Sequence, residues 1–185
     1  MAEVATKETT QAAPKYWWEK NFTTYVAVTA VILAVCATLA TFKAGGFSNM
    51  MVMSQSQASD QWAYYQAKSI KETSYQVSKD VMVILAAQQE GNPALKDQIN
   101  KYDKEITRYK QEKDEIMQEA KSLEKRRDFS QTLSIEIGRA VIMLQIGILL
   151  TSLAAINKTA SFWFMGMGSG AIGITMFVIA MMNTL

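Results

Sequence analysis

The sequence contains no histidine, one cysteine and two prolines in 185 residues. Without histidine the commonest metal ligand and the usual catalytic base are missing, and a lone cysteine cannot form a disulfide within the chain. The cysteine, Cys36, lies inside an apolar run, and no nucleophile has a base beside it. We therefore expect no catalytic residue, no metal and no cofactor, and we interpret the protein as a non-enzyme.

Charge is also missing from long parts of the chain. No Lys, Arg, Asp or Glu lies in 22–42 and only Lys158 lies in 140–185, whereas 43–139 carries 29 such residues. A soluble domain would spread its charges over every surface element, so this partition excludes an ordinary soluble globule. The charged stretch is nearly balanced in sign, which argues against nucleic-acid binding.

The charge-free runs predict three transmembrane helices, at 22–42, 140–157 and 160–182. A helix of about 20 residues spans the hydrocarbon core of a bilayer, which is about 30 Å thick. Residues 1–21 are expected to form a disordered polar tail with interfacial aromatic residues, including Trp17 and Trp18.

Small residues recur at helical spacing inside the predicted spans. In lipid there is little hydrophobic drive between helices, so small side chains favour close backbone approach and dispersion contact. The spacing predicts helix packing, within one chain or between chains, at Ala30, Ala34, Gly147, Gly166, Gly170 and Gly173.

The charged stretch, 43–139, predicts two long helices joined by a turn at 90–93, where Gly91 and Pro93 disfavour helix continuation. Apolar residues at alternating spacings of four and three favour a coiled coil. In the second arm this row includes Ile99, Tyr102, Ile106, Tyr109 and Ile116. In the first arm the most apolar row includes Ile70, Ser74, Val77, Val81 and Ile84.

Folding the chain at the turn sets small residues against large ones, for example Ser74 against Tyr109. The expected fold class is therefore all-α, with three transmembrane helices and a long antiparallel coiled-coil hairpin between the first and second.

A distinctive segment, QASDQWAYYQAKSIK, runs from Gln57 to Lys71. It resembles the signature of a bacterial membrane-protein family catalogued as domain of unknown function 4337. The order of an anchor, this segment, a charged coiled coil and two closing spans is similar as well, over most of 20–185. The resemblance implies an integral protein of the bacterial inner membrane, and it implies no activity.

Within this segment an aromatic and basic face lies beside the predicted seam. Such a face favours a second packing surface, and we interpret it as a candidate contact with another subunit or partner. Packing on the chain's own loop and an exposed amphipathic face are the alternatives. The residues are Trp62, Tyr64, Tyr65, Lys68 and Tyr75.

The leading functional hypothesis is an oligomeric scaffold or interaction protein, surrounded by membrane lipid, that projects its hairpin toward an unidentified protein partner. Charge near the predicted spans favours a periplasmic hairpin only slightly. The alternative is a subunit of an oligomeric ion channel, similar in layout to the proton-channel subunits of TonB-type systems. For the polar residues of the spans, bonding within or between helices is a better interpretation than lining a pore; they include Thr29, Thr38, Thr41, Gln145 and Thr175.

Overall fold

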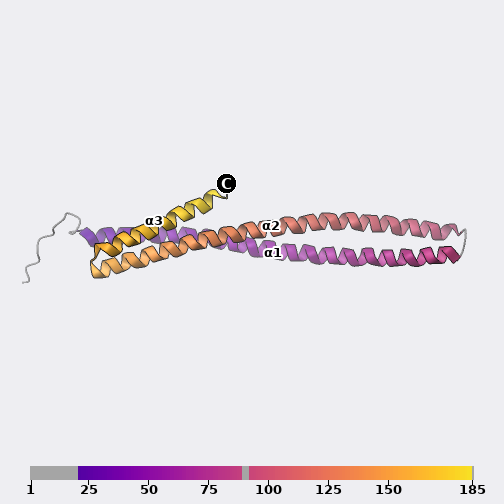
Figure 1. Ribbon diagram of the computed structural model, residues 1–185, viewed down its shortest axis with the longest axis horizontal. Coiled ribbons are helices and arrows are strands. Elements are labelled where there is room, and N and C mark those ends of the chain that lie inside the picture. The colour runs from indigo at the N-terminus through magenta and orange to yellow at the C-terminus, as the bar shows by residue number, and fades with distance from the viewer. Residues whose placement is uncertain (1–20, 89–91, 185) are drawn as a thin grey trace, which may run out of the picture. The chain divides into compact units, whose positions relative to one another are not determined.

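The computed structural model describes residues 21–88 and 92–184, and in this part of the chain the long regular elements are all α-helices. They are α1 (Phe22–Gln88), α2 (Pro93–Asn157) and α3 (Ala160–Met182) (Figure 1). The all-α prediction is confirmed. Residues 1–20 of the predicted tail (1–21), and Glu90 and Gly91 of the predicted turn, lie outside the described residues.

The two longer helices each continue through a boundary between apolar and charged sequence. α1 has 67 residues and α2 has 65, so each contains an apolar run and a charged stretch without a break. Gly45 and Gly46 do not interrupt α1, and a methyl group on either would meet no atom within 4 Å. A glycine inside a helix costs only about 1 kcal/mol relative to alanine, which the flanking helical turns outweigh.

The helices end and begin at residues suited to those positions. Pro93 opens α2, where its missing N–H is not needed, and the Oδ1 atom of Asn92 accepts a hydrogen bond from the Ala94 N–H at 3.1 Å. Between α2 and α3, Lys158 has a positive φ of 50° and Thr159 is extended. The single charge of 140–185 therefore lies at a helix break.

The chain divides into two compact units, with boundaries after Phe42 and before Glu136. We call residues 21–42 together with 136–184 the apolar region, and residues 43–88 together with 92–135 the arm region. The sequence placed the corresponding boundaries after Phe42 and after Arg139.

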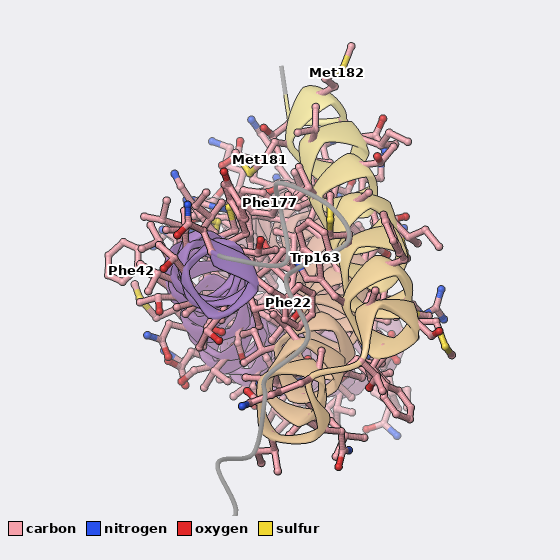
Figure 2. All side chains as sticks on the ribbon, turned by 90° about the vertical axis from the view of Figure 1, so that its left-hand side faces the viewer. Phe22, Phe42, Trp163, Phe177, Met181 and Met182 are labelled. Atoms are coloured by element: carbon pink, nitrogen blue, oxygen red, sulfur yellow. The ribbon has the colours of Figure 1, made fainter. Side chains whose placement is uncertain are left out.

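The apolar region contains the parts of α1, α2 and α3 that are long and apolar enough to cross a membrane. Their outward side chains are apolar as well: Phe42 is 79% exposed, and Figure 2 shows it pointing away from α1. The buried residues include Val26, Leu33, Ala37, Ala40, Ile137, Ala140, Leu144, Thr151, Ala154, Gly166, Gly170, Gly173 and Ala180.

Glycines allow the helices of the apolar region to approach closely. A Cβ atom added at Gly166 would lie 2.6 Å from the Thr151 hydroxyl oxygen, and one at Gly173 would lie 2.8 Å from the Leu144 Cγ atom. A side chain at either position would push α3 away from α2. The close contact between the two helices therefore depends on glycine at both positions. The glycines at such contacts include the predicted Gly147, Gly166, Gly170 and Gly173.

The structure corrects the predicted packing role of Ala34 within the chain. Ala34 is exposed and Ala30 is half-buried, whereas the neighbouring Leu33 is buried against Gly147 and Gly170. Successive residues of a helix lie about 100° apart, so turning Leu33 inward leaves Ala34 on the outer side. The larger side chain of Leu33 fills the space that the glycines leave.

Candidate functional site

In the arm region α1 and α2 pack closely, and the side of α1 that contacts α2 is rich in polar and aromatic residues. The contacting residues follow alternating spacings of four and three and are half-buried. We call them the inner row: Gln61, Tyr65, Lys68, Glu72, Tyr75 and Lys79.

The facing residues of α2 lie where the sequence predicted them. Ile106, Tyr109 and Ile116 are 5, 6 and 7% exposed, and Ile99 and Tyr102 are half-buried. Large apolar and aromatic side chains at this spacing leave a single side of α2 suited to burial, because the remaining sides are charged.

The α1 half of the predicted seam is wrong. Ile70, Val77 and Ile84 are 71, 57 and 61% exposed. We call this apolar face the outer row: Ala63, Ala67, Ile70, Ser74, Val77, Val81 and Ile84, all exposed. The inner and outer rows have the same spacing and lie two positions apart, which places them about 200° apart around the helix.

The physical reason is that the inner row supplies charged partners for residues of α2, and the outer row contains no charged residue. Ion pairs join Lys68 to Glu112 at 2.6 Å, Glu72 to Lys113 at 2.5 Å and Lys79 to Asp103 at 2.6 Å. The small apolar residues of the outer row would leave these α2 charges half-buried without partners, which is costly.

The central ion pair changes the protonation behaviour of both groups. The hydrogen bond from Lys68 lowers the pKa of the Glu112 carboxyl group, and the same bond raises the pKa of the Lys68 ammonium group. A hydrogen bond to Glu72 raises the pKa of Lys113 in the same way. Each shift favours the charged form of the group that carries it: Glu112, Lys68 or Lys113.

Tyrosine rings fill the space between the ion pairs. Tyr75 stacks on Tyr109 with ring centroids 5.6 Å apart and 28° between the planes, and it also touches Tyr102 at 5.8 Å. The ammonium group of Lys68 lies 5.4 Å from the centre of the Tyr109 ring, and that of Lys113 lies 5.3 Å from the Tyr65 ring. Aromatic stacking and cation–π contact therefore reinforce the ion pairs.

The residues predicted to contact another subunit contact α2 instead. Trp62 donates a hydrogen bond from Nε1 to the Glu124 carboxylate at 2.9 Å and packs edge-on against Tyr65 at 5.6 Å. Lys68 and Tyr75 belong to the inner row. Tyr64 is the exception, being 50% exposed, with the Lys68 ammonium group 5.1 Å from its ring centre.

The acidic partners, Glu72, Glu112 and Asp103, were missing from the sequence-based candidates. One signal for them was present: Lys113 interrupts an otherwise apolar row of α2, and a lysine at such a position needs an acidic partner across the interface. Glu72 lies outside the row that the sequence predicted for the seam of α1, so the sequence did not indicate this pair.

The arrangement supports specific helix pairing. Among the described residues no cluster of three or more His, Cys, Asp or Glu side chains could hold a metal ion. The ion pairs between α1 and α2 match each charge with an opposite one, which fixes the register of the two helices and the sides on which they face each other.

In the apolar region the four threonines named in the sequence analysis bond within their own helices, and Gln145 is exposed. The hydroxyl groups of Thr38, Thr41 and Thr175 each donate to a carbonyl four residues earlier, at 2.8 Å. Thr29 does the same and also accepts a hydrogen bond from Trp163 Nε1 at 3.2 Å. Trp163 lies edge-on to Phe22 at 5.9 Å, near one end of the region (Figure 2).

Comparisons with known proteins give a family and no further relative. No curated protein and no solved structure matches the chain. The family model described as a domain of unknown function, DUF4337, matches residues 22–183, which include all of α1, α2 and α3. The chain therefore belongs to the DUF4337 family.

Proposed function

We propose that this chain is an integral protein of a bacterial inner membrane that acts without catalysis, as an oligomeric scaffold. Its arm region is an antiparallel coiled-coil hairpin outside the bilayer that serves for contact with other protein. The observation that carries the proposal is the paired inner row: a helix pair whose charges and rings are matched along its length is built to be a stiff rod.

The contacts between α1 and α2 support the antiparallel direction. The partner on α2 rises in number as the residue on α1 falls: Lys79 meets Asp103, Lys68 meets Glu112, and Trp62 meets Glu124. The alternating spacing of four and three on both helices supports the coiled coil.

The apolar region supports the membrane placement. Three helices long and apolar enough to span, with apolar outward side chains, suit a lipid surrounding. Three spans would put the arm region and the C-terminus on one side of the membrane, and we place that side in the periplasm.

The channel alternative gains no support from the four threonines that the sequence analysis named in the spans. The hydroxyl groups of Thr29, Thr38, Thr41 and Thr175 are engaged with backbone carbonyls of their own helices. Polar groups used in this way do not have to line a water-filled path.

The scaffold proposal is tested on the full chain purified from membranes in a mild detergent. Native mass spectrometry is expected to give a multiple of 20.6 kDa, the mass of one chain. A chain that stays in the supernatant after membranes are pelleted, or a single chain in every detergent, would contradict it. Ion flux through liposomes containing the purified protein would support the channel alternative instead.

The hairpin is tested by charge exchange. Lys68→Glu should lower the melting temperature because two carboxylates then meet, and adding Glu112→Lys should restore it. Lys121→Glu, an exposed change of the same kind on α2, is the matched control and should have little effect. A double variant no more stable than Lys68→Glu would contradict the pairing.

A further inference from the structure

The outer row of α1 is an apolar surface that no described residue of the arm region covers. Ile70, Val77, Val81 and Ile84 are between 49 and 71% exposed. The row from Ala63 to Ile84 contains no charged residue and keeps alternating spacings of four and three over its whole length. A row of this kind on a water-facing helix is typical of a coiled-coil interface.

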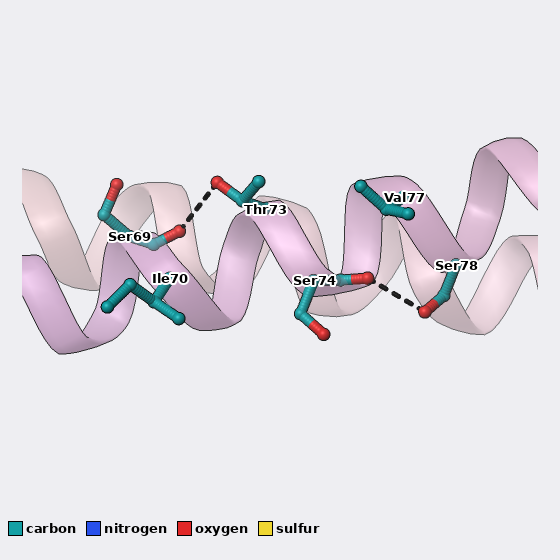
Figure 3. Close-up of a pocket in the computed structure, with 6 residues that line it drawn as sticks. All are labelled: Ser69, Ile70, Thr73, Ser74, Val77 and Ser78. Atoms are coloured by element: carbon teal, nitrogen blue, oxygen red, sulfur yellow. Dashed lines mark hydrogen bonds between the residues drawn. The ribbon is translucent and has the colours of Figure 1, made fainter.

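The middle of the outer row is a shallow groove along α1 (Figure 3). Ile70 and Val77 provide its apolar contacts. Two of the four hydroxyl groups that line the groove are used within α1, since Thr73 donates to the Ser69 carbonyl at 3.0 Å and Ser78 donates to the Ser74 carbonyl at 2.8 Å. The groove is otherwise lined by the apolar side chains of Ile70 and Val77, which suit an apolar helix.

The chain itself restricts which helix can fit. In the described arm region the apolar row of α2, with Ile106, Tyr109 and Ile116, already faces α1. The outer row is the long apolar row that stays exposed in the described arm region, so we expect a second copy to meet it with its own outer row. Contact between identical surfaces gives a two-fold symmetric interface.

We infer that two copies associate through their outer rows, as a parallel coiled coil of two α1 helices. The inference rests on the proposed function, because copies inserted in one membrane with one orientation present α1 in the same direction. In a parallel pair the flanking positions set Gln66 against Lys71 of the partner subunit and Thr73 against Ser78 of the partner subunit, so no like charges meet.

Toward the N-terminus, the next position of the outer row after Ala63 is occupied by Asp60, so the apolar row ends there. Two copies in parallel would set two Asp60 carboxylates against each other there, and such a pair is unfavourable in an apolar seam. The interface is therefore confined to the stretch from Ala63 to Ile84.

The exposed area suits association of copies that are already held close together. The four large side chains of the outer row expose on the order of 400 Å² per copy, about half of the roughly 800 Å² per partner that a standard interface buries. Such a contact is weak between free molecules. Anchoring both copies in one membrane raises their effective concentration, so the same contact becomes significant.

Cysteine crosslinking tests the inference directly on the full chain in membranes. The single native cysteine is first removed by Cys36→Ala. Val77→Cys and Ile84→Cys, in the outer row, are expected to form disulfide-linked dimers. The controls are their immediate neighbours, Gln76→Cys and Val83→Cys, which are exposed and point about 100° away.

The expected result is a crosslinked fraction at Val77→Cys and Ile84→Cys at least about tenfold above the controls at matched oxidation time, as a specific rather than collisional contact requires. Equal crosslinking at all four positions, or none at the outer row, would overturn the inference. In a mixture of Ile70→Cys and Val81→Cys chains, a parallel pair joins identical positions. Disulfides that form only between Ile70→Cys of one copy and Val81→Cys of the other would overturn the parallel direction.

A second measurement uses charge in place of cysteine. Val77→Asp should reduce the oligomer mass or weaken association at least about tenfold, because a buried unpaired carboxylate opposes dimerisation. Gln76→Asp adds the same charge beside the row and should have no such effect. An unchanged oligomer in both variants would overturn the outer-row interface and leave the scaffold proposal standing, whereas a wild-type chain that is always single would overturn both.

Discussion

The apolar region and the arm region hold their helices together by different interactions. In the apolar region, Gly166 and Gly173 bring α3 so close to α2 that no side chain fits between. In the arm region, ion pairs such as Lys68–Glu112 and the stacked rings of Tyr75 and Tyr109 fill the interface with large polar and aromatic groups. The first arrangement relies on dispersion contact at short range, and the second on matched charge and ring geometry.

The difference follows from the surroundings that each region suits. In the membrane that we propose, lipid tails are as apolar as the helix surfaces they would cover, so exposed residues such as Phe42 and Leu39 would cost little there. The same exposure in water is unfavourable, and it falls on Ile70, Val77 and Ile84 of the outer row. One helix, α1, therefore carries exposed apolar faces in both regions, and under our proposal lipid covers the first and a second copy of the chain covers the second.

The largest expected effect comes from filling a close contact of the apolar region. Gly166→Leu should lower stability by at least about 3 kcal/mol, because the side chain overlaps the Thr151 hydroxyl and the backbone of α2. Thermal unfolding of the detergent-solubilised protein, followed by circular dichroism, measures it. Gly168→Leu is the matched control, since no atom lies within 4 Å of a Cβ atom there. Equal losses of stability in the two variants would contradict the prediction that Gly166, and not Gly168, lies at a close helix contact.

A smaller effect is expected from removing the central ring of the arm region. Tyr75→Ala should cost about 2 kcal/mol, through lost burial and lost stacking on Tyr109. Tyr64→Ala removes the same kind of side chain from an exposed position and should cost clearly less. The same unfolding measurement compares them, and a larger loss for Tyr64→Ala would contradict the assignment of the inner row.

The ion pairs predict a pH dependence confined to the extremes. The pKa of Glu112 is lowered in the folded chain, so its contribution is complete above its unfolded pKa and is lost as pH falls through the folded value, below about pH 4. The pKa of Lys68 is raised, so its contribution is complete below its unfolded pKa and is lost as pH rises through the folded value, above 10.5.

Stability against pH is compared between the natural chain and a double variant, Lys68→Met with Glu112→Gln. The difference between their melting temperatures should be constant near neutral pH and shrink at both ends. A difference that changes between pH 6 and pH 8, the range in which neither group titrates, would show that another group is responsible.

The smallest effect is expected at a glycine that touches nothing. Gly45→Ala should stabilise α1 by about 0.5–1 kcal/mol, because Gly45 lies inside the helix with open space around it. Gly147→Ala makes the same change where a Cβ atom would lie 2.9 Å from the Gly166 carbonyl oxygen, and it should destabilise. A loss of stability at Gly45 would mean that flexibility at that point has a role.

Part of the candidate site could be predicted from the sequence. The row of α2 with Ile106, Tyr109 and Ile116 was found because it is the single apolar row on a charged helix. The predicted register between α1 and α2 was nearly right as well. Tyr109 was expected opposite Ser74, and it stacks on the next residue, Tyr75. The face of α1 was predicted wrongly, because its two rows share one spacing and the more apolar row was chosen.

The sequence by itself determined the division into apolar and charged segments, the helix breaks near Pro93 and Lys158, and the buried side of α2. These depend on local properties: the length of charge-free runs, the conformations open to each residue, and a single apolar row. The tertiary structure alone decided which side of α1 faces α2. That choice depends on whether Lys68, Glu72 and Tyr75 find partners across the interface, and a partner exists only once both helices are placed.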